Sequence, residues 1–234
     1  MAFTNGPKIG GITLNRQYFQ DPVLGKSFTG GTTTTNLVEN SSYNAANATG
    51  KLTNGTYFSS LGAGSFYFDG SDDQIRYDQG ANTYDPLLLP TVCTVYAWVY
   101  PLSSTGGIFS HWSGGPVNLG YWINGGKIAV YQYDGVWTNY DSSGASVSTN
   151  AWSQIAWVRS SSSSMSLYLN DSLNGTLTAT SPRVFGGGNN GVLGSLWGWQ
   201  FFNGYMGVFM IYFEAHSLSQ VQQTYNIFRD RYGV

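Results

Sequence analysis

Two patterns near the ends of the chain constrain its fold more than any other feature. Residues 65–75 read SFYFDGSDDQI, a strand that runs into an acidic turn. Residues 201–212 read FFNGYMGVFMIY, a long strand with small residues where backbones can approach. Between them, residues 91–101 and 152–159 are further unbroken runs of strand-forming residues. The chain is therefore predicted to be an all-β sandwich.

Turn signals between the strand patterns favour antiparallel sheets. Asn124-Gly125 separates residues 119–123 from residues 127–133, and Asn174-Gly175 follows another strand pattern that ends at Leu169. Asn-Gly supplies the positive φ that a tight hairpin needs, so both pairs predict hairpin turns. Many short strands joined in this way are typical of antiparallel sandwiches.

Side chains alternate along a strand with a period of two, so the strand within residues 91–100 should present a different set on each face. One face is expected to carry Cys93, Val95, Ala97 and Val99, and the other Tyr96, Trp98 and Tyr100.

One helix is predicted, near the C-terminus. Ser219 and Gln222 have the spacing of a capping box, so the helix is expected to begin near Ser219. Val221, Tyr225 and Phe228 recur at i, i+4 and i+7 and form one apolar stripe. This stripe should lie against the sandwich.

The order of these motifs resembles the laminin-G-like branch of the concanavalin A-like lectin/glucanase superfamily. The motifs are most similar to those of domains in bacteriophage virion proteins. In those domains a strand ending in Phe-Asp-Gly-x-Asp-Asp-x-Ile, here residues 68–75, opens the domain. The closing motifs are residues 202–212, Leu218-Ser219, Tyr225-Asn226 and Arg231-Tyr232-Gly233. The resemblance covers residues 36–234. It implies a concanavalin A-like jelly-roll β-sandwich of two antiparallel sheets with one short C-terminal helix.

The chain is expected to contain one domain and an arm. Residues 1–35 read as an N-terminal arm and linker, because Pro7, Pro22 and several glycines interrupt any regular element. Residues 36–234 form the predicted sandwich. The arm is expected to dock on its own domain or on a neighbouring subunit, and the neighbouring subunit is favoured.

Composition narrows the class of protein and its partners. Charged residues make up 9% of the chain, against about 25% in ordinary soluble domains, which suits an extracellular or assembled β-protein. The net charge is −2 and Lys and Arg form no run, so neither nucleic acid nor a membrane surface is expected as a partner. The N-terminal residues show no secretory signal. Release of a virion by lysis would need none.

The acidic turn is the strongest candidate metal site. Asp69, Asp72 and Asp73 cluster around Gly70, and clustered carboxylates supply the oxygen ligands that Ca²⁺ prefers. The alternative is that Asp69 and Asp72 cap the turn by accepting hydrogen bonds from nearby backbone N–H groups. The sequence leaves both alternatives open.

Aromatic residues at loops and strand ends form the candidate carbohydrate site. Sugars stack their C–H faces on Trp and Tyr, while amides and carboxylates bind their hydroxyl groups. Packing in the core or at a subunit interface explains the same aromatic residues equally well. The candidate carbohydrate-binding residues are Trp112, Trp122, Tyr133, Asp134, Trp137, Asn139, Tyr140, Trp197 and Trp199.

Hydrolysis of glycans is not expected, because glycosidases need two carboxyl groups that flank the scissile bond. The glutamates are Glu39 and Glu214, and neither has a second acid within four residues. The predicted function is that of a non-enzymatic bacteriophage virion protein, on the capsid, a head fibre or the tail, that presents a lectin-like surface. Its expected partners are other virion proteins, copies of itself and a cell-surface glycan. A free bacterial carbohydrate-binding module or adhesin is the alternative, and a polysaccharide-degrading enzyme is the least favoured.

Overall fold

The computed structural model describes residues 16–20, 22, 30–31, 33–35, 49–77, 89–112, 118–133, 137–178, 190–196 and 198–234. Within these residues the chain forms sixteen strands, a short 3₁₀ turn and one helix. The elements are β1 (Arg16–Gln20), β2 (Thr33–Thr35), β3 (Thr49–Thr53), β4 (Tyr57–Ser59), η2 (Leu61–Ala63), β5 (Ser65–Asp69), β6 (Gln74–Arg76), β7 (Cys93–Pro101), β8 (Gly106–Trp112), β9 (Asn118–Asn124), β10 (Lys127–Tyr133), β11 (Trp137–Asp141), β12 (Ser153–Arg159), β13 (Ser164–Leu169), β14 (Ser172–Thr178), β15 (Asn190–Leu193), β16 (Asn203–Tyr212) and α1 (Leu218–Tyr232).

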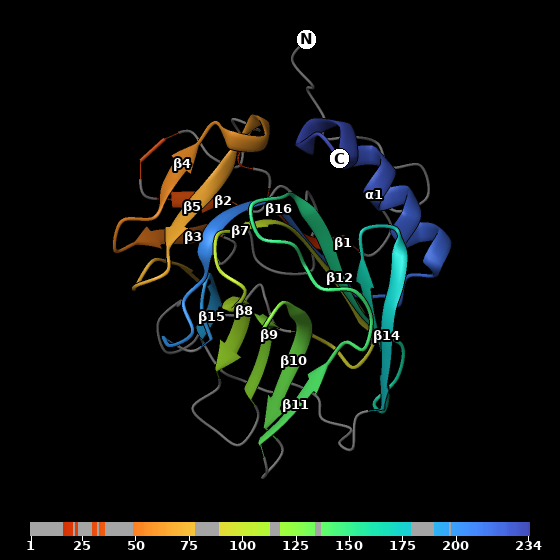
Figure 1. Ribbon diagram of the computed structural model, residues 1–234. Coiled ribbons are helices and arrows are strands. Elements are labelled where there is room, and N and C mark those ends of the chain that lie inside the picture. The colour runs from red at the N-terminus through yellow and green to blue at the C-terminus, as the bar shows by residue number, and fades with distance from the viewer. Residues whose placement is uncertain are drawn as a thin grey trace.

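The strands form two antiparallel sheets that pack face to face (Figure 1). Sheet A has the strand order β14-β13-β12-β7-β16-β5-β4, and β1 also pairs with β16. Sheet B has the order β11-β10-β9-β8-β15-β6-β3-β2. This architecture confirms the predicted all-β sandwich with one C-terminal helix.

The alternation predicted for β7 is confirmed. Cys93, Val95, Ala97 and Val99 belong to the core between the sheets. Tyr96 and Trp98 face the other way and belong to a second buried cluster, against which Tyr100 packs. Complete burial of a large apolar side chain contributes roughly 1.5–3 kcal/mol to stability, so both faces of β7 stabilise the fold.

Helix α1 covers the outer face of sheet A (Figure 1). Its apolar stripe is as predicted, because Val221, Tyr225 and Phe228 are all buried in this second cluster. The predicted cap at Ser219 is wrong. The capping residue is Ser217, which is extended (φ −70°, ψ 163°) and forms the capping box with Gln220. The helix therefore begins before Ser219.

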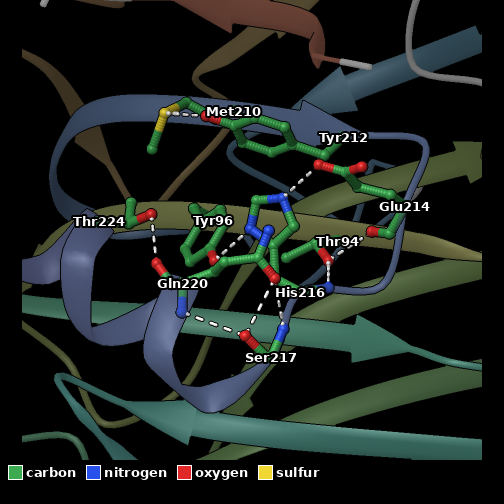
Figure 2. A network of polar contacts seen from close by, with 9 residues as sticks. All are labelled: Thr94, Tyr96, Met210, Tyr212, Glu214, His216, Ser217, Gln220 and Thr224. Carbon is green, nitrogen blue, oxygen red and sulfur yellow. Dashed lines mark hydrogen bonds and ion pairs between the residues drawn. The ribbon is translucent and has the colours of Figure 1, made fainter. Parts of the chain in front are cut away.

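A polar network ties the start of α1 to strand β7 (Figure 2). Nδ1 of His216 lies 2.8 Å from the phenol oxygen of Tyr96, and Nε2 lies 3.1 Å from a carboxylate oxygen of Glu214. A neutral imidazole with its proton on Nε2 satisfies both contacts, since it donates to Glu214 and accepts from Tyr96. Thr94 donates to the backbone oxygen of Glu214 and accepts from the backbone N–H of His216.

Two segments of the predicted arm belong to the chain's own sandwich. Strand β1 pairs with residues 209–212 of β16, beyond the stretch of β16 that pairs with β5, and places Phe19 opposite Met210. Strand β2 pairs with β3, with Thr34 opposite Gly50. These two segments therefore pair with strands of the chain's own domain. In the part of the chain that the structure describes, no helix has both the length and the hydropathy needed to cross a membrane.

Candidate functional site

The outer face of β9, β10 and β11 carries a mixed aromatic and polar surface. Leu119, Tyr121 and Ile123 of β9 point into the core. Trp122 therefore points outward, where it clusters with Ala129 and is flanked by the half-buried ring of Tyr131. The rings of Trp122 and Tyr131 lie 6.3 Å apart. We call this surface the sheet B face.

A chain of hydrogen bonds fixes the polar side chains of the sheet B face. The indole Nε1 of Trp122 donates to Oδ1 of Asn139 at 3.0 Å. Nδ2 of Asn139 donates to Oδ1 of Asp141 at 2.7 Å, and Nδ2 of Asn124 donates to the same carboxylate at 3.1 Å. Asn139 and Asp141 are exposed. Because an amide nitrogen carries two N–H groups, Asn139 has a second one to offer a ligand.

A tight turn places an exposed tryptophan beside this network. Leu196 and Trp199 exchange two backbone hydrogen bonds of 2.9 Å each, with Gly198 in the left-handed region (φ +84°) between them. The side chain of Leu196 occupies the space above Gly120, where a β-carbon would collide with it. Trp199 then stands edge-on to Tyr131 at 6.4 Å, with 44% of its surface exposed.

The predicted carbohydrate-binding residues fall into different environments. Trp199 and Asn139 lie on the exposed surface. Trp122 is only 8% exposed, so its ring packs beneath the surface residues and offers no open face on which a sugar could stack. Tyr140 is not on this face, because it packs against the core between the sheets.

The remaining predicted residues are described by their backbone or not at all. Trp112 ends β8 opposite Asn118, and Tyr133 of β10 pairs with Trp137 of β11, at one end of the sheet B face. Their side chains lie outside the described set, and so do Asp134 and Trp197.

Sequence reasoning missed Tyr131 and Asn124 as members of the site. The available signal was the period of two along β9, β10 and β11, which puts them on the face of Trp122. Together these groups can do what sugar binding requires. An exposed indole can stack on a pyranose or furanose ring, and fixed amide and carboxylate groups can bind its hydroxyls.

The acidic turn brings its three carboxylates together. One oxygen from each of Asp69, Asp72 and Asp73 lies within 4.8 Å of the others. Gly70 permits the turn, with φ +81°. The turn-cap alternative is confirmed for Asp69, whose Oδ1 accepts from the backbone N–H of Ser71 at 2.7 Å. The expected second cap at Asp72 is replaced by Asp73, which accepts from the backbone N–H of Asp69 at 2.9 Å.

The environment of the Asp73 carboxylate indicates whether the turn could bind a cation. The residue is 1% exposed, and its Oδ1 has no hydrogen-bond partner among the described residues. Burial raises the pKa of Asp73, and the hydrogen bond from Asp69 opposes this rise. An unsatisfied buried carboxylate oxygen beside two exposed carboxylates is a donor set that fits a hard cation such as Ca²⁺.

The sequence model of one family, described as the concanavalin A-like lectin/glucanases superfamily, matches residues 69–222. No curated protein matches the chain.

Several solved structures share the fold. Domain 4 of AbnA, a GH43 extracellular arabinanase from Geobacillus stearothermophilus solved with arabinotriose, is 19% identical, with a TM-score of 0.60 over 89% of this chain and 97% of that domain. The binding domain of Paraclostridial Mosquitocidal Protein 1 is 13% identical, with a TM-score of 0.68 over 92% of this chain and 53% of its own. The botulinum neurotoxin type G receptor binding domain is 16% identical, with a TM-score of 0.62 over 91% and 51%. The chain spans about half the length of the two toxin domains.

Proposed function

Because the chain belongs to the concanavalin A-like lectin/glucanase superfamily, we propose that it binds glycans through the sheet B face. The observation that carries this proposal is the exposed ring of Trp199 beside Tyr131. Tyr131 lies opposite Asn139 in the register of β10 and β11, so the ring and the amide–carboxylate network adjoin. The arabinotriose complex of one structural neighbour supports the inclusion of arabino-oligosaccharides among the glycans to be tested.

Affinity electrophoresis in gels that contain neutral polysaccharides tests the proposal. Trp199→Ala should weaken retardation about tenfold, because it removes the stacking surface and leaves the fold intact. Leu218→Ala is the matched control, since Leu218 is also 44% exposed but lies at the start of α1. Equal retardation of both variants would contradict glycan binding at Trp199.

The proposed role is binding without hydrolysis. Glu214 supports this part of the proposal, because its carboxylate contacts His216 in the loop between β16 and α1, on the outer side of sheet A and not on the sheet B face. A glycosidase would need two carboxyl groups about 5–10 Å apart across the bound glycan. Incubation with each polysaccharide that the protein binds should release no reducing ends. Release of reducing ends that disappears in Asp141→Asn would restore the enzyme alternative.

We place the protein on a bacteriophage particle, as a capsid, head-fibre or tail component that meets host glycans, and assign it virion proteins and copies of itself as partners. The low charge of 9% and the resemblance of its motifs to virion domains support this role. Sedimentation of lysates from the producing cells on a density gradient tests it. The chain should co-sediment with particles. Recovery only in free form or with the bacterial envelope would favour the carbohydrate-binding module or adhesin.

A calcium ion at Asp69, Asp72 and Asp73 is part of the proposal. The buried, unpartnered Oδ1 of Asp73 supports it. The ion would hold the turn between β5 and β6, and Asp72, whose carboxylate is exposed, would be the easiest ligand to remove without harming the fold.

A further inference from the structure

Four tyrosines form a continuous row across the outer face of sheet A. Tyr57, Tyr67, Tyr205 and Tyr100 come from the neighbouring strands β4, β5, β16 and β7, and each lies opposite the next in the strand register. Their ring centroids are 5.1, 5.0 and 5.8 Å apart in that order. We call these residues the tyrosine row.

One end of the tyrosine row packs close to α1, and the other end is exposed. At its covered end Tyr100 meets the buried ring of Trp152 at 5.7 Å, and Trp152 in turn packs on Tyr232 of the helix at 4.5 Å. Tyr100, Tyr205 and Tyr67 are half-buried, and Tyr57 at the open end is 51% exposed. The row is therefore rigid at one end and open to a ligand at the other.

Polar groups line the tyrosine row. Asp69 and Asn203 are the next outward-facing residues of β5 and β16, and they lie opposite each other in register. Ser59 is the next outward-facing residue of β4. Each of these residues, like each tyrosine, carries a hydroxyl, an amide or a carboxylate. The centre of a protein interface is usually more apolar than this.

Charge restricts the ligand further. On β4, β5, β16 and β7, none of the outward-facing residues is Lys or Arg, so these strands offer no cation to an anionic polymer. Arg231 of α1 lies near the row, and its guanidinium donates to the backbone oxygen of Gly64, just before β5.

We propose that the tyrosine row is a second glycan-binding surface, which takes an extended neutral polysaccharide on the side of the sandwich opposite the sheet B face. The class of ligand rests on the proposed function, but the surface is separate. Because each ring packs against its neighbours, the row loses little side-chain entropy on binding. The exposed ring of Tyr57 offers a face for stacking, and the phenol groups offer hydrogen bonds.

The test compares single and double variants of the full chain by affinity electrophoresis in neutral polysaccharide gels. Tyr57→Ala should weaken retardation about twofold to tenfold. Tyr67→Phe, which keeps the ring and removes only the hydroxyl, should weaken it in the same direction. Leu173→Ala is the control, because Leu173 is 53% exposed on the other edge of sheet A and is expected to change nothing.

Trp199→Ala in combination with Tyr57→Ala separates the two surfaces. The double variant should lose more retardation than either single variant. If Trp199→Ala alone abolished retardation and the tyrosine variants matched wild type, the second surface would be refuted and the proposed function would stand. If only the tyrosine variants lost retardation, the sheet B face would be refuted and the tyrosine row would stand. A wild-type dimer in sedimentation velocity that Tyr57→Ala converted to a monomer would make the row an interface between copies and overturn the inference.

Discussion

The phenol oxygen of Tyr232, near the end of α1, accepts a hydrogen bond of 2.9 Å from the backbone N–H of Val208 in β16. The register of β16 against β7 shifts between Met206 and Phe209, so this N–H falls out of the regular ladder. Gly207 leaves the space that the phenol occupies. The helix therefore satisfies a backbone group that the irregularity in the strand leaves free.

Removal of the Tyr232 hydroxyl group should lower the free energy of unfolding. Tyr232→Phe keeps the ring stacked on Trp98 but leaves the buried N–H of Val208 without an acceptor, at a cost of about 1–3 kcal/mol in the free energy of unfolding. Urea denaturation measures this change. Tyr225→Phe is the control, because Tyr225 also stacks on Trp98 and should cost less than about 0.5 kcal/mol. Equal losses in the two variants would contradict the role assigned to the Tyr232 phenol.

Stability should fall in acid because of His216. Burial lowers the pKa of His216 below its ordinary value, and Glu214 offsets part of this effect. Below about pH 6.5 the unfolded chain takes up a proton that the folded chain does not, so the free energy of unfolding declines until the pH passes the folded-state pKa. His216→Gln should flatten this part of the profile between pH 8 and pH 5. Glu214→Gln should steepen it. The groups that face the imidazole are Tyr96, Tyr212 and Glu214.

Calcium should stabilise the chain if the acidic turn binds it. A chelator is expected to lower the melting temperature and added Ca²⁺ to restore it, since at about 100 times its Kd a ligand of the folded state adds ~2.7 kcal/mol. Asp72→Asn should abolish the response without lowering the melting temperature in chelator. Asp171→Asn, an exposed carboxylate in another turn, should respond as wild type. An unchanged melting temperature from micromolar to millimolar Ca²⁺ would leave only the turn-cap role.

Gly120 should control glycan binding without touching the glycan. In Gly120→Ala the new methyl group collides with the side chain of Leu196 and displaces the turn that carries Trp199. Retardation in polysaccharide gels should weaken several-fold, while the melting temperature falls by only a few degrees. Normal retardation would show that the position of this turn does not matter for binding.

The strands of the sandwich could be predicted because their alternation is visible in a single segment. Local turn signals failed where two sequences that can form a turn lie close together in the chain. Asn174-Gly175 was expected to form a hairpin turn, but the turn falls at Asn170, which takes φ +56°. Asn174 is buried within β14 instead, and its amide donates to Ser142 and to the backbone of Ala145.

The binding surfaces could be predicted only in part because they join distant segments. Residue type suggested both Trp122 and Trp199, but only the crossing of Leu196 over Gly120 decides which ring is exposed. The tyrosine row draws on four strands whose order in the sheet differs from their order in the chain. Without the strand register, the sequence alone gives no reason to group Tyr57 with Tyr100.

Nuclear magnetic resonance of the ¹⁵N-labelled protein tests the central claim of glycan binding most directly. Neutral oligosaccharides, arabino-oligosaccharides included, would be titrated while the side-chain N–H signals are followed. Binding at the sheet B face predicts that the indole N–H of Trp199 and the amide N–H₂ of Asn139 and Asn124 shift together and saturate. The indole signal of Trp98, buried beneath α1, should stay in place. Signals of Trp199 and Asn139 that stay unmoved at millimolar concentrations of every oligosaccharide, or shifts confined to other parts of the chain, would contradict it.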